Sequence, residues 1–158
     1  KTPQQSAGTG SVQLPIAGQV PTTTATSSSV GEAGMLTLPG AGGSEVVTLD
    51  FTKASSTSED ASNPGLYHLN TPPSADPNAP YDITYESATQ YFNITLLAEP
   101  IGQTRLAMEQ DLMSKLGISE SQMCQLDYMV SVPYWVNAYF TGRNLGFSFC
   151  PGATTLPQ

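Results

Sequence analysis

Hydrophobic and polar residues alternate in two stretches of the C-terminal half of the chain. In residues 81–97 the apolar positions are spaced by two on either side of a polar turn at 87–90, which is the periodicity of strands with one buried face. These positions are Tyr81, Ile83, Tyr85, Phe92, Ile94 and Leu96. The alternation returns in 126–136 and 145–149, with a turn containing Gly142 between them. The pattern therefore predicts two hairpins.

Residues 101–116, between the two hairpins, follow a helical period instead. One arc of the helical wheel collects the apolar side chains. They are Ile101, Leu106, Met108, Leu112, Met113 and Leu116. Arg105 and Glu109 fall in the same arc as an i,i+4 pair of opposite charge. The spacing predicts an amphipathic helix that packs on a sheet.

The residues that follow carry signals for the end of one helix and the start of another. Gly117 stands where a left-handed C-cap is needed. Ser119 and Gln122 match a capping box, which predicts a short helix that reaches about Leu126.

The N-terminal half is poor in helix signals and predicts short strands between loops. Strand patterns occupy 35–38, 46–51 and 66–69, and prolines in 72–80 exclude a helix there. Together the elements predict one α+β domain over 35–158 with its core in 81–153. We expect an antiparallel sheet of hairpins with the amphipathic helix and the short helix packed on one face.

Residues 1–34 form a tail rich in Ser and Thr, whose only charges are Lys1 and Glu32. This composition buries too little apolar surface to fold alone and is typical of a stalk or linker. The segment 11–16 offers an alternative, because apolar residues alternate in it around Pro15, which only an edge strand tolerates. Val12, Leu14 and Ile16 are therefore candidates for an edge strand or for a donor strand given to a neighbour.

Charge excludes several classes of partner. The 158 residues include 13 acidic and 5 basic side chains, for a net charge of -8. The basic residues are scattered, whereas nucleic acids and anionic lipids require clustered cations. The chain contains no stretch of 18 or more apolar residues, the length that a membrane-spanning helix requires. Because the chain starts at Lys1, we expect a signal peptide or membrane anchor upstream.

The two cysteines, Cys124 and Cys150, favour a disulfide over a metal site. Two thiolates with His68 as the single histidine do not complete a zinc site. A disulfide would join the short helix to the last strand and would place the protein in an oxidising compartment, outside the cell or on its surface. The alternative is a pair of buried free thiols in a cytosolic protein.

Catalytic and metal-binding motifs are missing from the sequence. It contains no nucleophile elbow, HExxH motif, P-loop or paired CxxC motif. We therefore expect no catalytic residue, no metal and no cofactor. Acid pairs such as Asp82 and Glu86 leave a small secreted hydrolase open as a third reading.

Aromatic residues near the last turn suggest a contact surface. Trp135 lies off the apolar face of its strand, and Tyr139 and Phe140 follow in the turn. Exposed rings of this kind stack on sugars or anchor protein partners. The alternative is that the helices or the N-terminal strands cover this face.

The segments 96–100 (LLAEP) and 144–153 (NLGFSFCPGA), with the helix to Leu116 and Met123-Cys124 between them, resemble uncharacterised surface proteins of candidate-phyla, Parcubacteria-like bacteria. The similarity covers about residues 92–153. It implies an N-terminal membrane anchor, a Ser/Thr/Pro-rich spacer, an extracellular domain and pairing of Cys124 with Cys150. It implies no catalytic residue.

These observations favour a non-enzymatic extracellular or cell-surface domain that acts in adhesion, envelope structure or surface filament assembly. Its partners would be another protein, further copies of itself or a glycan. A carbohydrate-binding module that uses Trp135 and Tyr139 is the main alternative.

Overall fold

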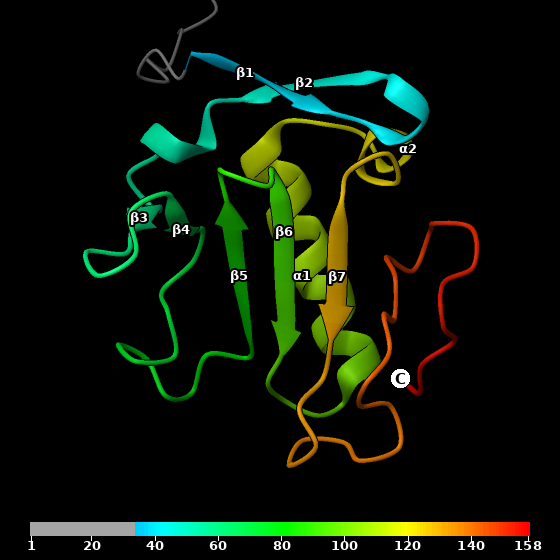
Figure 1. Ribbon diagram of the computed structural model, residues 1–158. Coiled ribbons are helices and arrows are strands. Elements are labelled where there is room, and N and C mark those ends of the chain that lie inside the picture. The colour runs from blue at the N-terminus through cyan, green and yellow to red at the C-terminus, as the bar shows by residue number, and fades with distance from the viewer. Residues whose placement is uncertain (1–33) are drawn as a thin grey trace, which may run out of the picture.

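The computed structural model describes residues 34–158, which form a sheet with a long helix behind it (Figure 1). The sheet has five strands in the order β3-β4-β5-β6-β7, and a separate hairpin, β1-β2, lies across one end. The strands are β1 (Met35–Pro39), β2 (Glu45–Leu49), β3 (Ser58–Glu59), β4 (Leu66–His68), β5 (Tyr81–Glu86), β6 (Tyr91–Leu96) and β7 (Tyr128–Ser131). The helices are α1 (Ile101–Leu116), α2 (Glu120–Met123) and two 3-10 turns, η1 (Ala41–Gly43) and η2 (Phe51–Lys53).

The α+β class predicted from the sequence is confirmed, and strands β3 to β6 pair antiparallel. The predicted hairpin of 81–97 is present as β5 and β6, with Ile83 opposite Ile94. The predicted segment 11–16, with Val12, Leu14 and Ile16, lies outside the described residues.

The second predicted hairpin, over 126–149, is wrong. Strand β7 ends at Ser131 and pairs parallel to β6, with Val130 opposite Ile94. Helix α1 returns the chain behind the sheet, so β7 starts at the same end as β6, in the usual right-handed crossover (Figure 1). Pro133 has no N–H to extend the ladder. Residues 145–149 run as irregular coil.

The core lies between the sheet and α1. Inward side chains of the strands meet α1 residues, and each fully buried side chain of this size contributes roughly 1.5–3 kcal/mol. The core residues of these elements are Ile83, Tyr85, Phe92, Ile94, Leu96, Met108, Leu112, Leu116 and Val130. Leu38, Val46, Phe51, Leu69 and Leu156, which lie outside 81–153, are buried in the same core. Because these residues come from both ends of the described chain, residues 34–80 and the C-terminus help to close the core.

The charged pair within α1 faces the interior more fully than its apolar neighbour. Arg105 is 4% exposed and Glu109 is 2% exposed, whereas Leu106 is 39% exposed. The expectation that Leu106 belongs to the buried arc is therefore wrong. The C-cap is confirmed, because Gly117 has a φ of 65° and its N–H donates to the Met113 carbonyl at 2.8 Å.

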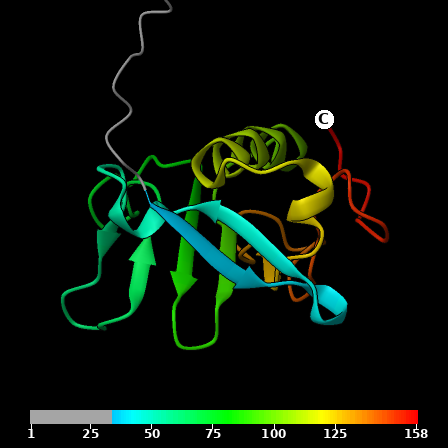
Figure 2. The same ribbon diagram turned by 90° about the horizontal axis from the view of Figure 1, so that it is seen from above.

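The β1-β2 hairpin covers the end of the molecule where α1 finishes (Figure 2). Strand β2 is the one nearer to α1, and Leu49 lies against Gly117, where an added Cβ would approach it to 2.9 Å. At the hairpin tip, Ala41 N–H donates to the Gln125 carbonyl at 2.7 Å. The hairpin therefore rests on the C-terminal half, and β1 forms its outer edge.

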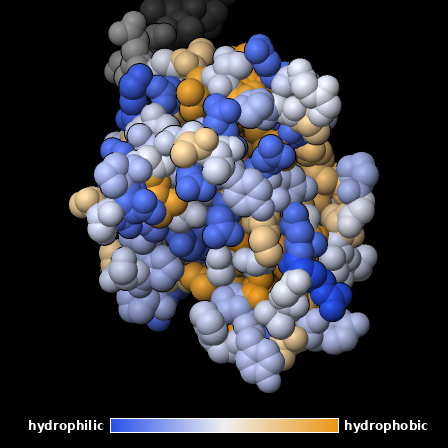
Figure 3. Space-filling view, viewed as in Figure 1, coloured by the Kyte–Doolittle hydropathy of each residue, from blue (hydrophilic) through white to orange (hydrophobic). Residues whose placement is uncertain are grey.

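The face of the sheet turned away from α1 is largely hydrophilic (Figure 3). Alternation along the central strands directs polar residues to this face. They include Asp82, Thr84, Glu86, Asn93, Thr95 and Ser131. No helix formed by residues 34–158 is long and apolar enough to cross a membrane.

Candidate binding surface

Three of the largest exposed hydrophobic side chains lie close together in the sequence. Tyr134 is 73% exposed, Trp135 is 79% exposed and Tyr139 is 73% exposed. All three belong to residues 133–144, which connect β7 to the C-terminal coil and which we call the aromatic loop. Exposed rings on one short loop form a candidate contact surface.

The aromatic loop starts in a tight turn that follows the end of β7. The Pro133 carbonyl accepts the N–H groups of Val136 at 3.0 Å and of Asn137 at 3.1 Å. Val136 packs partly against the core, while Tyr134 and Trp135, at the turn, are left in solvent. The turn thus fixes the backbone beneath the exposed rings.

Asn137 holds the middle of the loop. Its Oδ1 accepts the N–H groups of Tyr139 at 3.1 Å and Phe140 at 3.3 Å, as in an Asx turn. Its Nδ2 donates to Glu99 Oε1 at 2.7 Å, and Glu99 Oε2 accepts the Ile101 N–H at 2.8 Å. The loop is therefore tied to the first turn of α1.

Arg143 braces the far side of the loop. Its Nη2 donates to the Tyr139 carbonyl at 3.1 Å. The guanidinium carbon lies 5.5 Å from the centre of the Tyr139 ring and 6.0 Å from that of Phe140, within cation-π range. The two rings themselves meet edge to face at 4.8 Å. These contacts hold Tyr139 in position although it is exposed.

Asn144 closes the loop on the outer edge of β7. Its Oδ1 accepts the Val130 N–H at 3.0 Å and its Nδ2 donates to the Tyr128 carbonyl at 3.1 Å. The Leu145 N–H also donates to the Val130 carbonyl, at 2.8 Å. One side chain thus occupies backbone groups that a further strand would need.

Sequence reasoning identified most of this surface and missed one residue. The structure leaves Trp135 and Tyr139 in solvent, while Phe140 is half buried and packs against the core. Tyr134 was expected on the apolar face of a longer strand, and it is exposed because the strand ends before Pro133. Pro133 was the available signal for that end.

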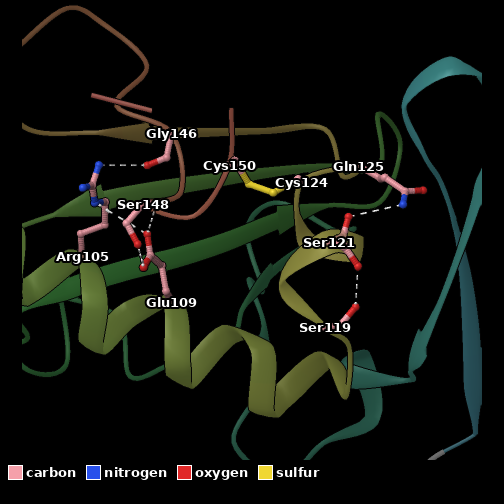
Figure 4. Close-up of a disulfide and its surroundings, with 9 residues drawn as sticks. All are labelled: Arg105, Glu109, Ser119, Ser121, Cys124, Gln125, Gly146, Ser148 and Cys150. Atoms are coloured by element: carbon pink, nitrogen blue, oxygen red, sulfur yellow. Dashed lines mark hydrogen bonds and ion pairs between the residues drawn. A yellow bond between two sulfur atoms is a disulfide. The ribbon is translucent and has the colours of Figure 1, made fainter. Parts of the chain in front are cut away.

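The disulfide between Cys124 and Cys150 is present, with 5.5 Å between the two Cα atoms. It joins the end of α2 to the C-terminal coil (Figure 4). Beside it, Arg105 and Glu109 extend from α1 toward the same coil and contact Gly146 and Ser148. Burial lowers the pKa of the Arg105 guanidinium, and the charge of Glu109 opposes that effect. This polar cluster is a buried clamp for the coil.

His68 is the centre of a second polar cluster, at the other side of the sheet. Its Nδ1 lies 3.5 Å from Asp82 Oδ1 and its Nε2 lies 3.7 Å from Asp60 Oδ2. Hydrogen bonds from Ser62 hold the pKa of the Asp60 carboxyl below its usual range. The two carboxylates face different ring nitrogens, so they do not converge on one point. No group of three or more His, Cys, Asp or Glu residues within 34–158 could hold a metal ion.

No protein-family model, curated protein or solved structure matches this chain. The resemblance of residues 92–153 to candidate-phyla surface proteins therefore stays an expectation.

Proposed function

We propose that this protein is a non-enzymatic extracellular or cell-surface domain that acts in adhesion and contacts its partner through the aromatic loop. The observation that carries the proposal is the exposure of Tyr134, Trp135 and Tyr139 on one loop. Trp, Tyr and Arg are the residues that most often dominate binding energies at interfaces.

The hydrogen bonds around the loop support a binding role over incidental exposure. The side chains of Asn137 and Arg143 form hydrogen bonds with the loop backbone, and Glu99 connects the loop to α1. A loop held in this way loses little conformational entropy when a partner binds. The rings are therefore presented in advance of binding.

The disulfide and the charge distribution support an extracellular or surface location. A disulfide between Cys124 and Cys150 persists in oxidising compartments. The chain has few charged residues and most of them are acidic, which keeps an exported domain soluble and disfavours binding to polyanions.

Binding of the labelled full chain to a glycan array and to intact cells tests the proposal. We expect Trp135→Ala and Tyr139→Ala to weaken binding by about tenfold or more, with little change in melting temperature, because both side chains are exposed. Met35→Ala, at a 63% exposed position outside the loop, is the matched control and keeps full binding. Adhesion through this loop is ruled out if Trp135→Ala binds as tightly as the parent chain. It is also ruled out if the parent chain binds neither the glycan array nor the cells.

A second candidate, self-assembly by strand addition, is favoured by the outer edge of β1. Asp50 N–H donates to the Gly34 carbonyl at 2.7 Å, so these residues form a hydrogen-bonded pair of the β1-β2 ladder. Such pairs alternate along an antiparallel ladder. The register therefore directs the N–H and C=O of Thr37 away from β2. No strand within 34–158 pairs with that edge, and β1 carries no charged residue, so it is a template for another strand.

Thr37→Pro tests the second candidate, because it removes an outward N–H and no bond to β2. Thr37→Val keeps the N–H and is the control. We expect the parent chain and the valine variant to associate with rising concentration in sedimentation velocity, and the proline variant to stay monomeric with its melting temperature retained. A parent chain that is monomeric at every concentration contradicts assembly through β1.

A further inference from the structure

Arg143 is the one basic side chain within residues 34–158 that has no carboxylate partner. Lys53 pairs with Asp50 at 2.7 Å, Lys115 pairs with Asp111, and Arg105 lies 3.7 Å from Glu109. Arg143 instead donates one N–H to the Tyr139 carbonyl, and its residue is exposed. Four of its five N–H groups therefore remain for a ligand.

The surroundings of Arg143 limit which anions it could recognise. The described residues carry twelve acidic and four basic side chains, so long-range repulsion disfavours a polyanion. A ligand with a single carboxylate avoids most of that repulsion and still gains two charge-assisted hydrogen bonds from a guanidinium. Glu99, the acid that contacts the loop, is already bound by Asn137 and by the Ile101 N–H.

The exposed Tyr139 ring beside Arg143, on the same loop as the exposed Trp135, favours a sugar over an acidic peptide. Aromatic faces supply flat apolar area with a polar rim, which suits the apolar face of a pyranose ring. An extended peptide needs free backbone groups along a strand. The neighbouring edge of β7 offers few, because Asn144 and Leu145 occupy the backbone of Tyr128 and Val130.

We propose that the aromatic loop binds a saccharide that carries one carboxylate, such as a glucuronic acid unit at the end of a neutral oligosaccharide. Arg143 binds the carboxylate, and Trp135 and Tyr139 stack against sugar rings. This inference rests on the proposed binding function of the loop and adds the chemical class of its ligand.

The experiment compares an oligosaccharide that ends in glucuronic acid with its carboxyl-reduced, neutral analogue by titration calorimetry on the full chain. We expect the parent chain to prefer the acidic sugar by about tenfold or more at low salt, with a smaller preference at high salt. Arg143→Gln should abolish the preference, so that the acidic and the neutral sugar bind with equal affinity. Because Arg143 also braces Tyr139, that common affinity should fall somewhat below the affinity of the parent chain for the neutral sugar. Lys53→Gln changes the net charge equally at a distant, exposed position and should keep the preference.

Each result separates this inference from the adhesion proposal. An unchanged preference in Arg143→Gln, or equal affinity of the parent chain for both sugars, overturns the acidic-sugar inference. Binding of an acidic peptide in place of both sugars, abolished by Trp135→Ala, overturns it too and leaves the adhesion proposal standing. Binding of either sugar that Trp135→Ala does not weaken overturns both. Arg143→Lys keeps the positive charge and loses the paired N–H donors of the guanidinium, so it should retain part of the preference for the acidic sugar. Full retention of the preference would assign it to charge alone.

Discussion

The Glu109 carboxylate accepts two hydrogen bonds from Ser148, one from its backbone N–H and one from its hydroxyl at 2.6 Å. Arg105, one helical turn earlier, donates to the Thr154 carbonyl at 2.8 Å and lies 3.4 Å from the carbonyl oxygens of Leu145 and Gly146. The two charges thus satisfy backbone groups of a coil that forms no strand ladder beyond the hydrogen bond from Leu145 to Val130 of β7. A pair buried to this degree is costly to break, because removal of one member leaves the other charge unpaired in the interior.

Glu109→Gln should destabilise the protein by about 3–5 kcal/mol, because the Arg105 charge then has no counter-ion. Urea denaturation followed by circular dichroism measures the change in the free energy of unfolding. Ser148→Ala is the control, since it removes one hydroxyl and keeps the backbone N–H, and should cost only about 1–2 kcal/mol. A loss below about 1 kcal/mol in Glu109→Gln would show that the charge pair does not hold the coil.

The same clamp explains why the closing hairpin could not be predicted. Leu145, Phe147 and Phe149 alternate like a strand, and the first two are fully buried. Alternation records which side chains are buried and does not record whether a ladder partner exists. In this fold Arg105 and Glu109 on α1 hold the coil in place of a neighbouring strand. The sequence carried one signal of this role, because both charged residues fall inside the apolar arc of the helix.

The Cys124–Cys150 disulfide should stabilise the protein by roughly 3.5 kcal/mol, the loop-closure value for a separation of 26 residues. The Cys124→Ala/Cys150→Ala variant, measured by urea denaturation, should lose about that amount. Alkylation of the denatured, non-reduced parent chain should label neither cysteine. Labelling of both thiols by mass would contradict the disulfide, and an unchanged stability of the double variant would contradict its energetic role.

The composition of the candidate binding surface was predictable, and its geometry was not. Trp135 stood out as an aromatic residue off the apolar face of its predicted strand, and Tyr139 as one in the turn that follows. Their positioning depends on Asn137, which receives backbone N–H groups two and three residues ahead and reaches Glu99 across the fold. The contact between Asn137 and Glu99 joins residues far apart in the sequence, so no local sequence pattern predicts it. Only the fold brings the start of α1 beside the loop.

Tyr81 should make stability fall in strongly alkaline solution. Burial and, next, the charge of Asp111 raise the pKa of Tyr81 to about 12, and the phenol hydroxyl lies 3.2 Å from Asp111 Oδ2. The unfolded phenol has a pKa of about 10. Between these values the unfolded chain releases the proton first, so stability present below pH 10 is lost as the pH rises toward 12.

Urea denaturation at several pH values from 9 to 12, with phenolate absorbance to follow ionisation, measures this loss. Tyr81→Phe should flatten the dependence and leave a smaller slope from Tyr85, whose pKa burial also raises. Tyr134→Phe, which removes the hydroxyl of an exposed tyrosine, is the matched control. An equal slope in Tyr81→Phe and the parent chain would assign the alkaline loss to other groups.

Asn144 should protect the molecule from edge-to-edge association. Asn144→Ala uncovers the Val130 N–H and the Tyr128 carbonyl on the outer edge of β7, and loss of a partner for the buried Val130 N–H should cost about 1–3 kcal/mol. The freed edge can then pair with another chain, so sedimentation velocity should show association that the parent edge prevents. Asn93→Ala removes an exposed asparagine from the open face and is the matched control. Because Asn144 also closes the aromatic loop, its loss should weaken ligand binding even where the fold persists. Equal stability and equal association of the Asn144 and Asn93 variants would show that the Leu145 bond alone seals β7.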